Sequence, residues 1–104
     1  MNPWALLVLA GLLETGWAIG LKYSDGFTRI VPSVLTVGGV IVSFWLLSIA
    51  MRSLPVGTAY AVWVGIGATG TAILAIVLFG EPLNAVRVAG IGLILAGIAA
   101  LRFA

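Results

Sequence analysis

The stretch GTAYAVWVGIGATGTAILAIVLF, residues 57–79, contains no charged side chain and follows Pro55. An α-helix that crosses the hydrocarbon core of a bilayer needs about 20 consecutive, mostly apolar residues. Proline is tolerated at a helix entrance, because the N–H group that it lacks has no partner inside the helix there. Residues 57–79 therefore predict a membrane-spanning helix.

Three further apolar stretches of similar length lie on either side of this helix, at residues 3–21, 32–51 and 85–102. Hydrophobic residues make up 62% of the 104 residues and charged residues only 8%, whereas a soluble domain carries about 25% charged residues. No basic residue precedes the first apolar stretch, and this stretch continues past any expected cleavage site, so it fits a retained helix rather than a signal peptide. We expect one all-α membrane domain, residues 1–104, with four transmembrane helices.

Composition excludes several classes of function. The chain has no cysteine and no histidine, and these are the usual thiolate and imidazole ligands of a protein-bound metal. No nucleophile-and-base pair can be assembled, so we expect no enzymatic activity, no metal and no cofactor. The net charge of +2 comes from scattered basic residues, which does not favour a nucleic-acid partner.

The basic residues are nearly balanced between the two sides of the membrane. Four spans place Arg52, Arg102 and the terminal amine on one side, and Lys22, Arg29 and Arg87 on the other. An excess of Lys and Arg in the cytoplasmic loops normally sets the orientation. We therefore predict a dual-topology chain that pairs as an antiparallel homodimer; the alternative is a single orientation with a weak preference.

Small residues at helical spacings mark the fourth stretch, and they are Gly90, Gly92, Ala96 and Gly97. Small residues let helix backbones approach closely in lipid, where packing rather than the hydrophobic effect drives association. These residues are predicted to pack at the dimer interface. Packing of the fourth helix on its own neighbours is the alternative, and both can hold together.

Glu14 is the one charged residue near the middle of a predicted span. A carboxylate at membrane depth costs at least ~2.5 kcal/mol on insertion scales and marks a functional site by default. A salt bridge inside the membrane is the structural alternative, but Arg52 and Arg87 lie near helix ends, where their side chains can extend to water. Glu14 is therefore predicted to bind a proton or a cation in turn, because desolvation favours its neutral form.

The residues around Glu14 indicate a cavity with aromatic and hydroxyl groups. Gly11 and Trp17 share its helix face, Thr36 and Ser43 mark a hydroxylated stripe on the second helix, and Tyr60, Trp63 and Gly67 share a face of the third. Aromatic rings suit a cation, and hydroxyls can orient a carboxylate. Tyr60 and Trp63 can instead be packing or boundary residues, and the hydroxyls can bond to their own helix. Gly65 and Gly67 allow either bending of the third helix or close packing.

The chain resembles the small multidrug resistance family, and its guanidinium-exporter branch in particular, over essentially the whole length. The matching segments are AGLLE (10–14), WAIGLKYS (17–24), GFTR (26–29), PS (32–33), LPVGTAYAVW (54–63) and GIGA (65–68). Trp17, three residues after the glutamate, separates this branch from the exporters of polyaromatic cations. Val64 departs from the pattern, since the guanidinium branch often has Thr at this position.

The resemblance implies a proton-coupled antiporter in the bacterial inner membrane that exports guanidinium or small guanidinyl cations by alternating access. It implies an antiparallel homodimer with a shared pair of Glu14 side chains, in which Trp17 and Ser43 hold the carboxylate and Tyr60 and Trp63 form an aromatic wall. The alternative within the family is a multidrug exporter of quaternary ammonium and lipophilic cations. A passive cation channel and a small structural or regulatory membrane subunit are the readings outside it.

Overall fold

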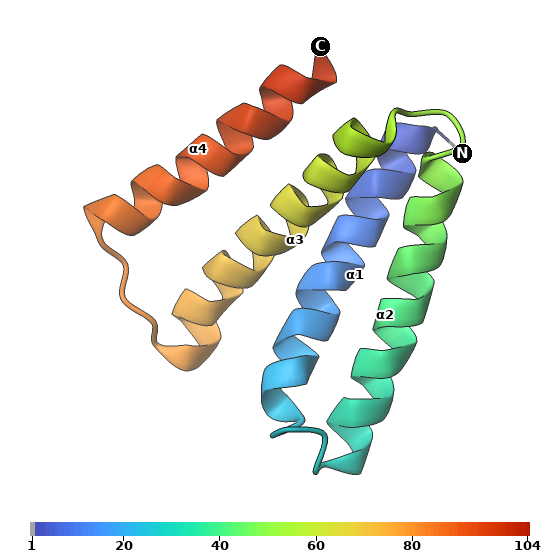
Figure 1. The fold of residues 1–104 in the computed structure, drawn as a ribbon. Helices are drawn as coiled ribbons and strands as arrows, with labels where there is room; N and C mark the ends of the chain where they lie inside the picture. Colours follow the sequence, from blue (N-terminus) through green and yellow to red (C-terminus); the bar gives the residue numbers. More distant parts are fainter. Residues whose placement is uncertain (1) are drawn as a thin grey trace.

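The computed structural model describes residues 2–104 and contains four helices joined by short connections (Figure 1). The helices are α1 (Pro3–Tyr23), α2 (Ile30–Ala50), α3 (Val56–Phe79) and α4 (Ala85–Arg102). All four are long and apolar enough to cross a membrane. The α1–α2 and α3–α4 connections lie at one end of the molecule, and the α2–α3 connection lies at the other end with both termini (Figure 1).

The helix ends follow from local sequence signals. Asn2 caps α1 by accepting a hydrogen bond from the Trp4 N–H (2.8 Å), and Asn84 caps α4 in the same way from the Arg87 N–H (2.8 Å). An Asn side chain at this position satisfies an N–H group that has no partner inside the helix. Gly80 ends α3 in the left-handed conformation, with φ 64°, which glycine adopts without steric cost.

Three helices differ slightly in extent from the sequence prediction. Helix α1 continues to Tyr23 rather than ending at residue 21, and α2 begins at Ile30 rather than at residue 32 and ends at Ala50. Pro32 lies in the first turn of α2, where the absence of its N–H breaks no helical hydrogen bond. Helix α3 begins at Val56, directly after Pro55.

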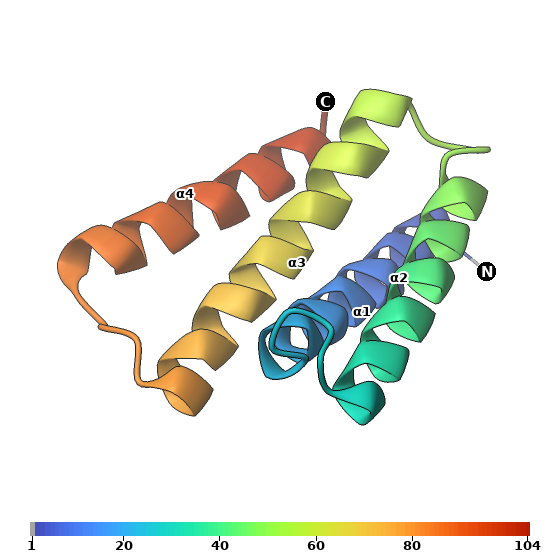
Figure 2. The same ribbon diagram turned by 60° about the horizontal axis from the view of Figure 1, so that its bottom comes forward.

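Helix α1 lies at the centre of the packing, against both α2 and α3 (Figures 1 and 2). The buried core follows its contact line, and its most buried members include Leu7, Ala10, Ala50, Ala59 and Val62. Small residues allow this close approach. A Cβ added at Gly11 would lie 2.7 Å from Ile66 Cβ, and one added at Gly70 would lie 3.1 Å from Thr15 Cβ. The three helices therefore form a tight unit without α4.

Helix α4 packs mainly on α3, and its last residue, Arg102, also lies over the ring of Trp4 in α1, 4.9 Å from the ring centroid. None of the residues of α4 is buried. Its C-terminal half lies beside α3, where a Cβ at Gly65 would approach Ile98 Cδ1 to 2.8 Å. Its N-terminal end lies further from α3 (Figures 1 and 2), and a cavity of about 310 Å³ separates Ile73 and Val77 from Val88 and Ile91. Helix α4 therefore presents most of its surface to the surroundings of this chain.

Candidate functional site

Glu14 lies on the side of α1 that faces α3, and its side chain is partly buried. A Cβ added at Gly67 would lie 2.6 Å from Glu14 Cγ and would overlap the carboxyl group as well. The neighbouring Thr15 hydroxyl lies 3.2 Å from the Gly67 carbonyl oxygen, so it fixes the two helices at this level. Gly67 therefore provides the space that the Glu14 side chain occupies.

A cavity of about 430 Å³ opens beside Glu14 between α1, α3 and the start of α4. Its walls are mostly small or apolar. Within residues 2–104, the charged side chains that line it are Glu14, Glu81 and Arg87, and Arg87 forms an ion pair with Glu81. The remaining lining residues are Trp17, Ala18, Val64, Gly67, Ala68, Thr71 and Ala72.

Among the described residues, no side chain forms an ion pair or a hydrogen bond with the Glu14 carboxyl group. A carboxylate so placed must be neutralised by something that enters the cavity. A proton or a cation can do this.

Ser43 connects three helices, but its partners differ from those that the resemblance implies. Its hydroxyl donates to the Ala10 carbonyl oxygen of α1 (2.7 Å) and accepts a hydrogen bond from Trp63 Nε1 of α3 (3.0 Å). The ring of Tyr60 contacts that of Trp63 in a tilted arrangement, with the centroids 5.5 Å apart. Ser43, Tyr60 and Trp63 therefore form one cluster, about one helical turn from Glu14, and no hydrogen bond joins Ser43 to the Glu14 carboxyl.

The two aromatic residues of this cluster line a separate cavity of about 400 Å³. Tyr60 and Trp63 form part of its wall together with Phe44, whose ring lies edge-on to Trp63 with the centroids 5.3 Å apart. Neither Tyr60 nor Trp63 lines the cavity beside Glu14. In the single chain, the aromatic pair and the carboxylate therefore face separate spaces.

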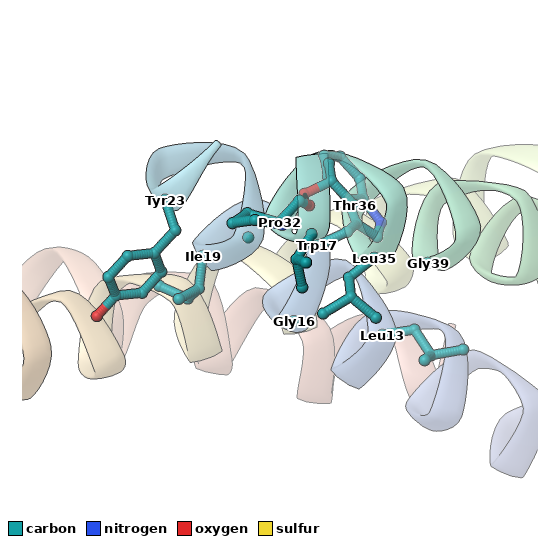
Figure 3. A pocket seen from close by; sticks show the side chains of 11 residues that line it. Leu13, Gly16, Trp17, Ile19, Tyr23, Pro32, Leu35, Thr36 and Gly39 are labelled. Atoms are coloured by element: carbon teal, nitrogen blue, oxygen red, sulfur yellow. Dashed lines mark hydrogen bonds between the residues drawn. The ribbon is translucent and has the colours of Figure 1, made fainter. Parts of the chain in front are cut away.

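Trp17 borders two spaces at once. It lines the Glu14 cavity, and it also lines a groove of about 440 Å³ between α1 and α2, together with Thr36 and Gly39 (Figure 3). Its indole Nε1 is buried and has no hydrogen-bond partner among residues 2–104. The Thr36 hydroxyl donates to the Pro32 carbonyl oxygen (2.7 Å), so it is used within its own helix and faces the α1–α2 groove rather than Glu14.

The glycines predicted from the sequence fall into three groups. The first is Gly67, which faces Glu14. The second consists of glycines at helix contacts: Gly11 packs against Ile66 of α3, and Gly65 packs against Ile98 of α4. The third group lies on α4, where Cβ atoms added at Gly90, Gly92 or Gly97 would meet nothing within 4 Å. Ala96 is exposed as well. The three α4 glycines therefore have open space in front of them within the part of the chain that the structure describes.

The sequence prediction omitted three residues of this region. Thr15 connects α1 to α3. The sequence contained a signal for this contact, because Gly67 and Gly70 are three residues apart and share a helix face, and in the structure they lie against Glu14 and Thr15. Glu81 and Arg87 reach the same cavity from the α3–α4 connection and the start of α4. No local pattern indicates this placement, since it depends on how α4 is set against α3.

We expect Ser43→Ala to lower the free energy of unfolding by between about 1 and 2 kcal/mol, because it leaves the buried Trp63 N–H without its acceptor and removes the hydrogen bond from Ser43 to the Ala10 carbonyl oxygen of α1. Unfolding of the detergent-solubilised protein by SDS measures this. Ser48→Ala is the matched control, since the exposed Ser48 hydroxyl has, among residues 2–104, one hydrogen-bond partner, the Trp45 carbonyl oxygen of its own helix. An equal loss in the two variants would contradict a special role for Ser43.

Comparison with known proteins identifies the family of this chain. The model of the "Small Multidrug Resistance protein" family matches residues 2–94. A protein from Yersinia pseudotuberculosis serotype I (strain IP32953), named "Guanidinium exporter", is 60% identical over 101 residues, which cover 97% of each chain. The "Guanidinium exporter" of Escherichia coli (strain K12) is 61% identical over 99 residues, covering 95% of this chain and 94% of the relative.

The names of the family and of these relatives denote transport rather than catalysis. The four apolar helices, together with the bacterial origin of the relatives, make this chain a multi-pass protein of the bacterial inner membrane. The family match covers α1, α2 and α3 completely, and with them the cavity beside Glu14. The chain belongs to the small multidrug resistance family.

Proposed function

We propose that this protein exports guanidinium or small guanidinyl cations in exchange for protons, and that cation and proton compete for Glu14. The observation that carries the proposal is a carboxylate at membrane depth that faces a cavity and has no basic partner among residues 2–104. Relatives about 60% identical over nearly the whole chain carry the name "Guanidinium exporter", which supports the choice of substrate.

The chemistry of guanidinium suits this cavity. Guanidinium is planar, remains charged at neutral pH and presents N–H groups in a fork that matches the two oxygens of a carboxylate. The Glu14 carboxylate supplies the acceptor, Trp17 supplies an aromatic wall for the cation, and Thr71 supplies a hydroxyl. Small residues at Ala18, Gly67 and Ala68 leave the room that the cation needs.

Exchange follows from the requirement that the Glu14 carboxylate be neutralised at membrane depth. When the cation leaves, a proton takes its place, and when the proton leaves to one side, the next cation can bind. Coupling requires that the cavity open to the two sides of the membrane in turn, because a site open to both sides at once would conduct. The proposal therefore includes alternating access.

We propose an antiparallel homodimer of dual topology as the working unit. Four helices of one chain leave α4 without a buried residue, and its glycines have open space in front of them. A second copy packed on this face would bury it, as small residues in membrane helices favour. The near balance of basic residues between the two ends of the helices supports insertion in both orientations.

An exporter of quaternary ammonium and other lipophilic cations is the second candidate. Two observations favour it. The cavity of about 430 Å³ is roomy for a cation as small as guanidinium, and Val64, in its wall, offers an apolar surface where the guanidinium branch often has a hydroxyl. Trp17 opposes this candidate, since a bulky side chain borders the cavity that contains Glu14.

Transport measurements on purified protein in liposomes test the proposal. We expect guanidinium to evoke currents by solid-supported membrane electrophysiology, and we expect its apparent KM to rise as the pH falls. In the range where the protonated carboxyl predominates, competition predicts about a tenfold rise for each pH unit. An apparent KM independent of pH would refute the competition, and transport of tetraphenylphosphonium without guanidinium would favour the second candidate.

A further inference from the structure

Glu81 and Arg87 give the Glu14 cavity two charged groups that the exchange mechanism does not use. Glu81 lies in the connection after α3, and its side chain is 44% exposed. Arg87 lies in the first turn of α4, where Asn84 caps its N–H, and its side chain is 25% exposed. Both line the cavity that contains Glu14. The pair therefore stands where the cavity meets the end of the membrane span.

The Arg87 guanidinium acts on any cation that approaches Glu14 through this opening. Arginine keeps its charge at every physiological pH, so an unpaired Arg87 would repel the incoming cation. Glu81 cancels that charge by pairing with it. The net electrostatic attraction that draws a cation toward Glu14 is therefore stronger when Glu81 is paired with Arg87 than when Arg87 is unpaired.

The ion pair is suited to exchange. Pairs between partly exposed side chains are weak, because water and salt screen them. A long arginine side chain near a helix end can turn its charged group to water when it is displaced. The group that Glu81 binds on Arg87 is itself a guanidinium, so the same carboxylate presents a matching fork to a guanidinium from solution.

We propose that Glu81 is a docking site for the cation at the entrance of the Glu14 cavity, and that the Arg87 guanidinium occupies this site when no cation is present. The inference rests on the proposed transport of guanidinium. The cation first displaces Arg87 from Glu81 and then passes from Glu81 to Glu14. If the Glu81–Arg87 ion pair served only to hold α4 in place, it would have no direct effect on the binding of the cation.

Opposite effects of the two partners distinguish docking from a structural role. Glu81→Gln leaves the Arg87 charge unpaired, so we expect the KM for guanidinium to rise about threefold or more at low ionic strength. Arg87→Gln leaves Glu81 free, so we expect the KM to fall. The double variant Glu81→Gln/Arg87→Gln should lie between them. Both shifts should shrink in high salt, because salt screens charges at a cavity mouth.

Asp25→Asn is the matched control. Asp25 lies in the α1–α2 connection at the same end of the molecule, carries the same charge and does not line the cavity. Its φ of 50° is in the left-handed region, which Asn tolerates well. We expect this variant to keep the parental KM. Size-exclusion profiles and thermal melts identify variants that fold, and Arg87→Gln alone decides the question if Glu81→Gln does not fold.

Solid-supported membrane electrophysiology with guanidinium separates failure of the docking site from failure of the transport function. A parent protein without guanidinium currents would refute the transport function and the docking site with it. Normal parental currents, with KM shifts in the same direction for the two single variants or with no shift, would refute the docking site alone. A rise in KM for Glu81→Gln with a fall for Arg87→Gln supports it.

Discussion

Replacement of Glu14 by Gln is expected to abolish guanidinium-evoked currents, to the level of liposomes without protein. Gln keeps the size and the polarity of the side chain but can neither carry the negative charge nor exchange a proton. Both halves of the proposed cycle require that charge, since the cation binds to it and the proton replaces the cation. Solid-supported membrane electrophysiology across a pH series measures the currents.

The fold should tolerate this substitution well. Glu14 has no ion pair among residues 2–104, and a neutral amide at membrane depth costs less than a carboxylate. We expect the variant to unfold at the same SDS concentration as the parent or a higher one. Asp25→Asn serves again as the control that removes a carboxylate outside the span. Full guanidinium currents from Glu14→Gln would overturn the proposed function.

Gly67→Ala is expected to raise the KM for guanidinium by about tenfold or more, which corresponds to about 1.4 kcal/mol of binding free energy. The added Cβ would lie 2.6 Å from Glu14 Cγ, which is closer than two carbon atoms can approach. Because the atoms in its way belong to a flexible side chain, Glu14 can rotate aside. The carboxylate then leaves the position in which it faces the cavity.

Stability should respond differently from binding in this variant. Ala in place of Gly inside a helix stabilises it by about 0.5–1 kcal/mol, which offsets part of the cost of displacing Glu14. Gly38→Ala, on α2, is the matched control, because its Cβ would meet nothing within 4 Å. We expect Gly38→Ala to keep the parental KM. Equal KM values for Gly67→Ala and the parent would show that Gly67 does not make room for the carboxylate.

The four helices were predictable because a segment that crosses lipid must satisfy its backbone N–H and C=O groups by hydrogen bonds within its own helix. That requirement makes every span a long apolar run, which can be read directly from the composition of residues 57–79 and its counterparts. The ends were less predictable. Helix α1 continues past its apolar part to Tyr23, and α2 begins at Ile30, two residues before the proline that the prediction took as its start. A proline is tolerated anywhere in the first turn, so its position does not fix the first residue of a helix.

Within the site, the sequence showed which residues share a helix face but not which cavity each face lines. It placed Glu14, Trp17, Ser43, Tyr60 and Trp63 around one cavity. In the single chain the structure brings Ser43 to Trp63 and to the Ala10 backbone, while Gly67 lies beside Glu14. Rotation of each helix about its axis decides such pairings, and the low contrast between apolar faces inside a membrane leaves that rotation unspecified in the sequence.

The sequence by itself determined four spans, a lone acid at membrane depth and the matching segments that indicated the family, because each of these is a property of one segment or of its order along the chain. Only the tertiary structure decided that Gly67 accommodates Glu14 and that the Glu81–Arg87 pair borders the same cavity. Those relations depend on how α1 and α4 are set against α3. Such settings arise from packing between helices, where side chains distant in the sequence compete for the same space.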